Sequence, residues 1–224
     1  MPDYVWYASY GSNLHTDRLN YYIQGGTPPG TNHYYPGMRD RTPPQETAAL
    51  NLPGAIYFTW ESPVWTGGVA FYAPEPPRTW PAGAAARAYL ITTSQFADLQ
   101  NQEMYRAPGP ELDLTEVLAT GRSQLGPGRY ETLVHAADLG GWPVLTFTAP
   151  WNPHTVQLNS PSQRYLHMII SGLHEAHHWE APQLLRYLAK LPGVDGNWPE
   201  AELRALIEAT LESHGTSPQS AQPA

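Results

Sequence analysis

The sequence predicts an α+β protein, because strand-like segments fill its first two thirds and helical segments its last third. The strand-like segments are short runs of β-branched and aromatic residues, bounded by glycine, proline and polar residues. In residues 160–211, apolar side chains instead recur every three or four positions, which is typical of helices. With 224 residues, of which 24 are proline and 19 glycine, the chain can bury one sizeable core between frequent loops.

The expected strands are spread over the first 149 residues. They cover residues 6–9, 47–52, 55–60, 67–72, 87–93, 130–135 and 144–149. An early helix is expected over residues 15–23, and the glycine pair at 25–26 would end it. A second short helix is expected over residues 94–99, directly after a buried strand.

Three helices are expected in the last third of the chain. The first lies within residues 160–179, the second covers about 182–190, and the third begins near Asn197. The end of the chain is poor in apolar residues, so we expect it to be disordered. The predicted division is a main domain of residues 1–180, a helical extension of residues 181–213 packed on it, and a tail of residues 214–224.

The composition excludes several classes of protein. The chain carries 12 basic against 20 acidic residues, a formal charge of −8, and Lys190 is its only lysine, so no nucleic-acid partner is expected. The lack of cysteine excludes disulfides and thiolate chemistry. No signal peptide and no apolar run of membrane-spanning length is visible. We therefore expect a soluble, cytoplasmic protein without a membrane partner, as a monomer or homodimer.

A turn of small and polar residues follows the first strand, with the sequence Tyr10-Gly11-Ser12-Asn13-Leu14. Gly11 permits backbone conformations that other residues resist, and Ser12 and Asn13 suit turns and helix starts. A strand that passes through such a turn into a helix points a row of backbone N–H groups outward, and this row can hold an anion. As a bare pattern the signal is weak, since most turns of this kind bind no ligand.

Glu103 is the candidate for proton transfer. It ends the segment that follows the strand of residues 87–93, and Met104 and Tyr105 stand beside it. An apolar setting disfavours the charged carboxylate and raises its pKa towards a value useful for proton transfer. From this stretch alone, a surface glutamate at a helix end is the simpler interpretation.

Taken together, the turn and the segment before Glu103 resemble the γ-glutamylcyclotransferase family. YASYGSNL at residues 7–14 is similar to its signature turn, and LITTSQFADLQNQE at residues 90–103 is similar to the segment that ends in its catalytic glutamate. GGVAFY and NSPSQRYLHMIISGLHEA look like its central strand and its closing helix. The resemblance covers about residues 4–180 and implies a small mixed β-barrel with outer helices, here followed by a helical C-terminal extension.

The resemblance also implies an intramolecular acyl transfer, in which Glu103 is the general acid/base. The α-amine of a γ-glutamyl compound would attack its own γ-carbonyl and release 5-oxoproline and an amine or amino acid, with no cofactor and no metal. The partner would be a small molecule with a carboxylate. Backbone N–H groups of Gly11, Ser12, Asn13 and Leu14 would hold that carboxylate. Tyr7, Tyr10 and Trp151 would line the pocket.

Two other functions fit parts of the sequence. His174-Glu175-x-x-His178 matches the H-E-x-x-H pattern of zinc hydrolases, in which two histidines one helical turn apart share the metal and the glutamate activates water. A solvated, histidine-rich helix end is the simpler interpretation of that stretch. The other alternative is a non-catalytic binding module with the same fold, although such a module would gain nothing from a buried acid at Glu103.

Three segments have no counterpart in the resemblance. They are the proline- and glycine-rich loop of residues 27–45, the insert of residues 73–86, and the helices beyond Pro182. Within the loop, the Arg39-Asp40-Arg41 charges are expected to be solvated.

Overall fold

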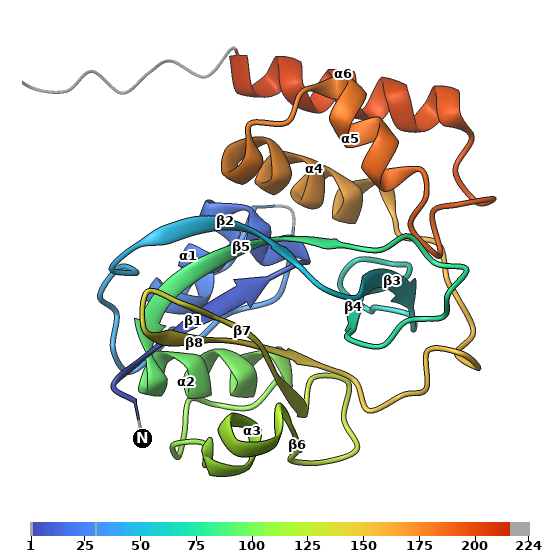
Figure 1. The fold of residues 1–224 in the computed structure, drawn as a ribbon. Helices are drawn as coiled ribbons and strands as arrows, with labels where there is room; N and C mark the ends of the chain where they lie inside the picture. Colours follow the sequence, from blue (N-terminus) through green and yellow to red (C-terminus); the bar gives the residue numbers. More distant parts are fainter. Residues whose placement is uncertain (1, 30, 216–224) are drawn as a thin grey trace, which may run out of the picture.

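The computed structural model describes residues 2–29 and 31–215, which form one large sheet, one small sheet and helices on both sides (Figure 1). The large sheet has the strand order β2-β5-β1-β8-β7-β6. Its strands are β1 (Tyr4–Ser9), β2 (Thr47–Leu52), β5 (Ala84–Thr92), β6 (Arg122–Gln124), β7 (Thr132–Leu139) and β8 (Trp142–Thr148). The central strand β1 pairs antiparallel with β5 and parallel with β8, so the sheet is mixed. The predicted α+β class is confirmed.

The expected closed barrel is wrong for the described part of the chain. There the six-stranded sheet ends in two edges, β2 and β6, and β3 (Ala55–Thr59) and β4 (Val69–Ala73) form a separate antiparallel hairpin. The hairpin approaches β8 through a side chain: the Thr148 hydroxyl accepts from the Tyr72 N–H at 3.1 Å and donates to its carbonyl at 2.8 Å. At this point the hydroxyl bridges the hairpin and β8, which lie in separate sheets.

Strand β1 separates two apolar clusters, because its side chains alternate between the two faces of the sheet. Val5 and Tyr7 belong to the cluster that contains residues of α1 and α2, whereas Trp6 and Ala8 belong to the one that contains residues of α4, α5 and α6. In Figure 1, α2 covers one side of the sheet, and α4, α5 and α6 stack over the other. The helices are α1 (Thr16–Gln24), α2 (Thr93–Glu103), α3 (Thr115–Thr120), α4 (Gln163–His177), α5 (Ala181–Leu188) and α6 (Glu200–Gly215), with a 3₁₀ turn η1 (Ser12–Leu14) before α1.

The elements follow the predicted order, with two additions. Helix α3 and strand β6 are short and were not expected. Helices α5 and α6 pack into the same apolar cluster as α4, and α6 extends to Gly215. The predicted disordered tail lies outside the described residues from position 216 onward, and the division of the chain into a domain and an extension stays a prediction. No helix in the described ranges is both long and apolar enough to cross a membrane.

Candidate active site

The turn after β1 contains the 3₁₀ turn η1, which the Leu14 N–H closes by donating to the Gly11 carbonyl at 3.0 Å. Gly11 has a φ of −115° and so does not use the left-handed region that favours glycine, while its ψ of −144° lies outside the ordinary extended range. Close approach also favours glycine there: a Cβ on Gly11 would lie 2.8 Å from the Tyr165 hydroxyl oxygen, so a larger residue would displace that side chain. Helix α4, which carries Tyr165, therefore packs directly against the turn.

Helix α2 places Glu103 beside this turn. The helix begins with a capping box, in which Thr92 and Gln95 each bond the backbone of the other, and Glu103 is its last residue. The Asn13 side-chain amide donates to Glu103 Oε1 at 3.0 Å and to the Tyr7 hydroxyl at 3.3 Å. The structure thus joins the two segments that carry the family resemblance.

Both segments line one small inner cavity of about 60 Å³. The predicted residues found in its wall are Tyr7, Tyr10, Gly11, Ser12, Asn13 and Glu103. Leu14 lies behind it, where its carbonyl accepts from the Tyr89 hydroxyl at 3.3 Å, and its N–H is already used in the turn. Trp151 lies elsewhere: it packs against the Phe71 ring at 4.9 Å and lines two other cavities.

The pKa of Glu103 is raised, as the sequence led us to expect, although polar and charged groups surround the carboxyl group. Its carboxyl is partly buried, and this desolvation raises its pKa above the ordinary value. Four interactions lower the pKa of Glu103, but together by less than desolvation raises it. They are a hydrogen bond from the Tyr22 hydroxyl, the charges of Arg18 and Arg129, and the hydrogen bond from Asn13. The carboxyl group can therefore hold a proton more readily than an exposed glutamate and still release it to a nearby base or take one from a substrate.

Sequence reasoning missed the two arginines of the inner cavity. The Arg18 guanidinium lies 4.6 Å from the Tyr35 ring centroid, and that of Arg129 lies 4.4 Å from the Tyr105 ring centroid. Glu103 is the single carboxylate among the described residues that line the cavity, so the arginines leave it with an excess of positive charge. The sequence offered a sign that Arg18 is buried, since it stands one helical turn after Leu14 on the apolar side of the predicted helix. It offered no such sign for Arg129.

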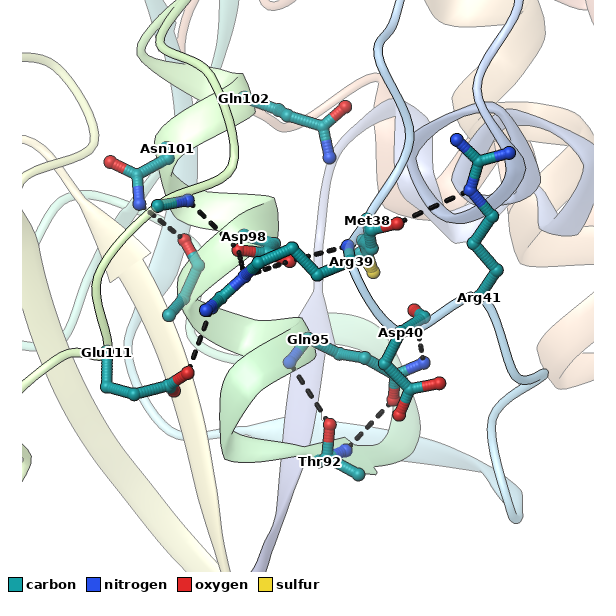
Figure 2. A network of polar contacts seen from close by, with 12 residues as sticks. Met38, Arg39, Asp40, Arg41, Thr92, Gln95, Asp98, Asn101, Gln102 and Glu111 are labelled. Atoms are coloured by element: carbon teal, nitrogen blue, oxygen red, sulfur yellow. Dashed lines mark hydrogen bonds and ion pairs between the residues drawn. The ribbon is translucent and has the colours of Figure 1, made fainter.

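The loop of residues 27–45 is fastened to α2 by a polar network (Figure 2). The backbone N–H and the Nε of Arg39 donate to the fully buried Asp98 carboxylate at 2.8 and 2.9 Å, and Arg39 Nη2 lies 2.9 Å from Glu111. The Gln95 amide donates to the Thr42 carbonyl at 2.8 Å. The Arg39 side chain is 45% exposed, as expected for a solvated charge cluster, but it is also paired with Asp98 of the helix that carries Glu103.

The side chain of Glu175, the acid of the H-E-x-x-H match, is engaged in ion pairs. Its Oε1 lies 2.8 Å from His15 Nδ1, and its Oε2 lies 2.9 Å from Arg87 Nη1. His178 ends α4 in the left-handed conformation, with a φ of 55°. Among residues 2–29 and 31–215, no group of three His, Cys, Asp or Glu side chains is arranged to hold a metal ion. In this structure Glu175 joins α4 to its neighbours.

Comparison with known proteins adds a sequence relative and several similar folds. No family model matches the chain. Over 210 residues the chain is 30% identical to Histone deacetylase 5 of Arabidopsis thaliana, a match that covers 83% of this chain and 30% of that protein. The chain thus spans less than a third of the length of this relative, whose name describes the whole of that longer protein.

The similar solved structures share low identity with this chain. A γ-glutamyl cyclotransferase is 16% identical at a TM-score of 0.48, and the human uncharacterized protein loc79017 is 15% identical at 0.48. Each of these matches covers 92% of this chain and 99% of the other. YkqA from Bacillus subtilis is 17% identical at a TM-score of 0.45, covering 85% of this chain and 56% of that one. None of the three assigns an activity to this chain.

Proposed function

We propose that this chain is a γ-glutamylcyclotransferase-like enzyme, an acyltransferase or lyase that releases 5-oxoproline and an amine or amino acid from a γ-glutamyl compound. The observation that carries the proposal is the position of Glu103. Its carboxyl group is partly buried in the inner cavity, has a raised pKa, and lies 3.0 Å from Asn13 of the turn. This arrangement fits the role that the resemblance implies for both segments.

In the proposed reaction, Glu103 is the proton carrier. Its carboxylate takes a proton from the substrate's α-ammonium, and the resulting amine attacks the γ-carbonyl carbon. A carbon–nitrogen bond forms to close the five-membered ring, and the amide carbon–nitrogen bond breaks. Glu103 passes this proton to the leaving nitrogen, then takes a second proton from the ring nitrogen and delivers it too. The amine therefore leaves as an ammonium, the product is a neutral lactam, and Glu103 is again a carboxylate.

The cavity wall offers complementary groups for a substrate that bears both an ammonium and a carboxylate. Backbone N–H groups of the turn from Gly11 to Asn13 face the carboxylate in this proposal. The buried Asn13 Oδ1 has no hydrogen-bond partner among the described residues, so it can accept from the ammonium. Because the nucleophile belongs to the substrate, holding it near the γ-carbonyl can supply about 7–11 kcal/mol of the barrier in a well-oriented case.

The decisive experiment compares the parent protein with Glu103→Gln, using metal-free protein and a panel of γ-glutamyl amino acids and γ-glutamyl amines. We expect 5-oxoproline release by the parent and a loss of at least about 100-fold in the variant, because the amide cannot carry the proton. Ligand affinity should change little, since the shape of the side chain is kept. Glu111→Gln, an exposed acid near the same helix, is the control and should retain activity.

Three results would contradict the proposal. Full activity of Glu103→Gln would remove Glu103 from the mechanism. Binding of panel members without release by the parent would favour the non-catalytic binding module. Release that requires added zinc and is lost in His174→Ala would favour the zinc hydrolase.

A further inference from the structure

Arg18 is a buried cation whose hydrogen-bonding capacity is only partly used. The residue is 5% exposed, and its Nη2 donates to the Tyr35 hydroxyl. Its Nε and Nη1 atoms are buried and have no hydrogen-bond partner among the described residues. Buried donors without partners are costly, more so on a charged group, so such a side chain in a cavity wall calls for an anionic ligand.

Arg18 lies at the boundary between two cavities. Together with Trp65 it lines both the inner cavity and a second, outer cavity of about 620 Å³. Apolar side chains of the outer wall come from three helices, with Tyr21 from α1, Met168 from α4 and Leu206 from α6, and from the loop after α1. Most of the exposed surface of the wall is apolar, although polar and charged side chains also line it: His15, Asp17, Thr31, Gln163, Arg164 and His167.

The two cavities differ in size, so each suits a different part of a substrate. At about 10–15 Å³ for each water molecule, the inner cavity has room for about four to six groups of that size, enough for a compact acyl head. The outer cavity falls within the range of about 300–1,000 Å³ that is common for ligand pockets. A single small leaving group, such as that of γ-glutamyl-alanine, would leave most of it empty.

We propose that the substrate spans both cavities, with its γ-glutamyl head at Glu103 and a bulky, apolar leaving group in the outer cavity, and that Arg18 binds a carboxylate of that leaving group. The inference rests on the proposed function. It names Arg18 as a residue that determines specificity and the leaving group as an aromatic or large aliphatic amino acid or a peptide beginning with one.

The chemistry of such a leaving group places its carboxylate near Arg18. In a γ-glutamyl amino acid, this carboxylate is attached to the carbon next to the scissile nitrogen. When the γ-carbonyl lies at Glu103 in the inner cavity, the neighbouring carboxylate therefore lies near the boundary between the cavities. A γ-glutamyl amine of the same bulk has no anion to offer at that place.

The first test measures binding in the Glu103→Gln background, so that the ligand is not consumed. The probes are γ-glutamyl-tryptophan and γ-glutamyl-tryptamine, which differ by one carboxylate, and affinity is measured by calorimetry. We expect the tryptophan compound to bind at least about tenfold more tightly, as a charge-assisted hydrogen bond provides. Adding Arg18→Gln should bring this ratio to about one, with Arg18→Lys restoring part of it.

The second test fills the outer cavity. Met168→Trp should lower the ratio of kcat/KM for γ-glutamyl-tryptophan to that for γ-glutamyl-alanine by about tenfold, because the new indole occupies the space of the leaving group. Leu125→Trp adds the same side chain at an exposed position away from the described cavities, and should keep the parent ratio. Equal ratios in the Met168→Trp variant and the parent would overturn the assignment of the outer cavity.

The outcomes separate the two proposals. Release of 5-oxoproline from γ-glutamyl-alanine, with equal binding of the tryptophan and tryptamine compounds, overturns the further inference and leaves the proposed function standing. Binding of γ-glutamyl-tryptophan that depends on Arg18, without any cyclisation by the parent, supports the ligand site and overturns the reaction. No binding of either tryptophan-derived compound overturns the further inference.

Discussion

Opposing forces act on the carboxyl group of Glu103. Desolvation raises its pKa, and hydrogen bonds from Tyr22 and Asn13, with the nearby arginine charges, lower it by less. Because the folded pKa lies above the ordinary value of 4.5, folding favours the protonated form. This contribution to stability is complete below the unfolded pKa and is lost as the pH rises through the folded pKa. Glu103→Gln should therefore stabilise the fold above that pH, which is the cost of keeping an acid in the cavity.

At the residue scale, Tyr22→Phe tests how this carboxyl is tuned. The Tyr22 hydroxyl favours the ionised form of Glu103, so its removal should raise the carboxyl pKa further. Because the proposed base must be ionised, the acidic limb of the kcat/KM–pH profile should move to higher pH. The exposed Tyr34→Phe is the control and should leave the profile in place. An unchanged or lowered limb in Tyr22→Phe would contradict the assignment.

Helix α2 positions Glu103, and the loop of residues 27–45 holds the helix. The buried Asp98 carboxylate accepts from the backbone N–H and Nε of Arg39 and from the Gly109 N–H. These bonds attach two other segments of the chain to the helix at Asp98, five residues before its last residue, and Figure 2 shows those from Arg39. The loop therefore contributes to the site through the helix rather than through its own side chains at this end.

At the element scale, the two acidic partners of Arg39 give a matched comparison. Asp98→Ala leaves buried N–H groups without partners and should lower the free energy of unfolding by about 3 kcal/mol. Glu111→Ala removes an exposed partner of the same arginine and should cost less than about 1 kcal/mol. Urea unfolding measures both, and 5-oxoproline release should fall in Asp98→Ala alone. Equal losses of stability would show that Asp98 does not anchor the loop.

Across the whole molecule, Glu175 joins three elements that meet behind the turn. It bonds His15 and Thr16 at the start of α1, and Arg87 of β5, from its own place on α4. Burial disfavours the charged form of Glu175, but the bonds from His15 and Thr16 more than offset this and lower its pKa to about 2. Glu175, which suggested zinc chemistry, thus links strand β5 to helices α1 and α4.

For the whole molecule, we predict a loss of stability in Glu175→Gln that depends on pH. A fall of the pKa from 4.5 to about 2 corresponds to about 3 kcal/mol of unfolding free energy near neutral pH. This contribution is complete above the unfolded pKa, and the difference from the parent should shrink as the pH falls from about 4.5 to about 2. Urea unfolding across that range measures it, with the exposed Glu208→Gln as control. Lost activity at unchanged stability would instead support a catalytic Glu175.

The sequence by itself determined the α+β class and the order of the main strands and helices, because these depend on local periodicity and on caps and breakers within neighbouring residues. That Glu103 and the turn from Tyr10 to Leu14 share a site was implied by the family resemblance of two segments. The short elements α3 and β6 were not predicted, because too few residues carry their pattern.

Only the tertiary structure decided which distant groups complete the site. It placed Arg18 in the wall of two cavities, placed Trp151 at cavities other than that of Glu103, and brought the Tyr165 hydroxyl close to Gly11. It also left the sheet open where Thr148 bridges to the hairpin. Each of these outcomes depends on contacts between residues far apart in the chain, and local preference cannot encode which partners packing will supply.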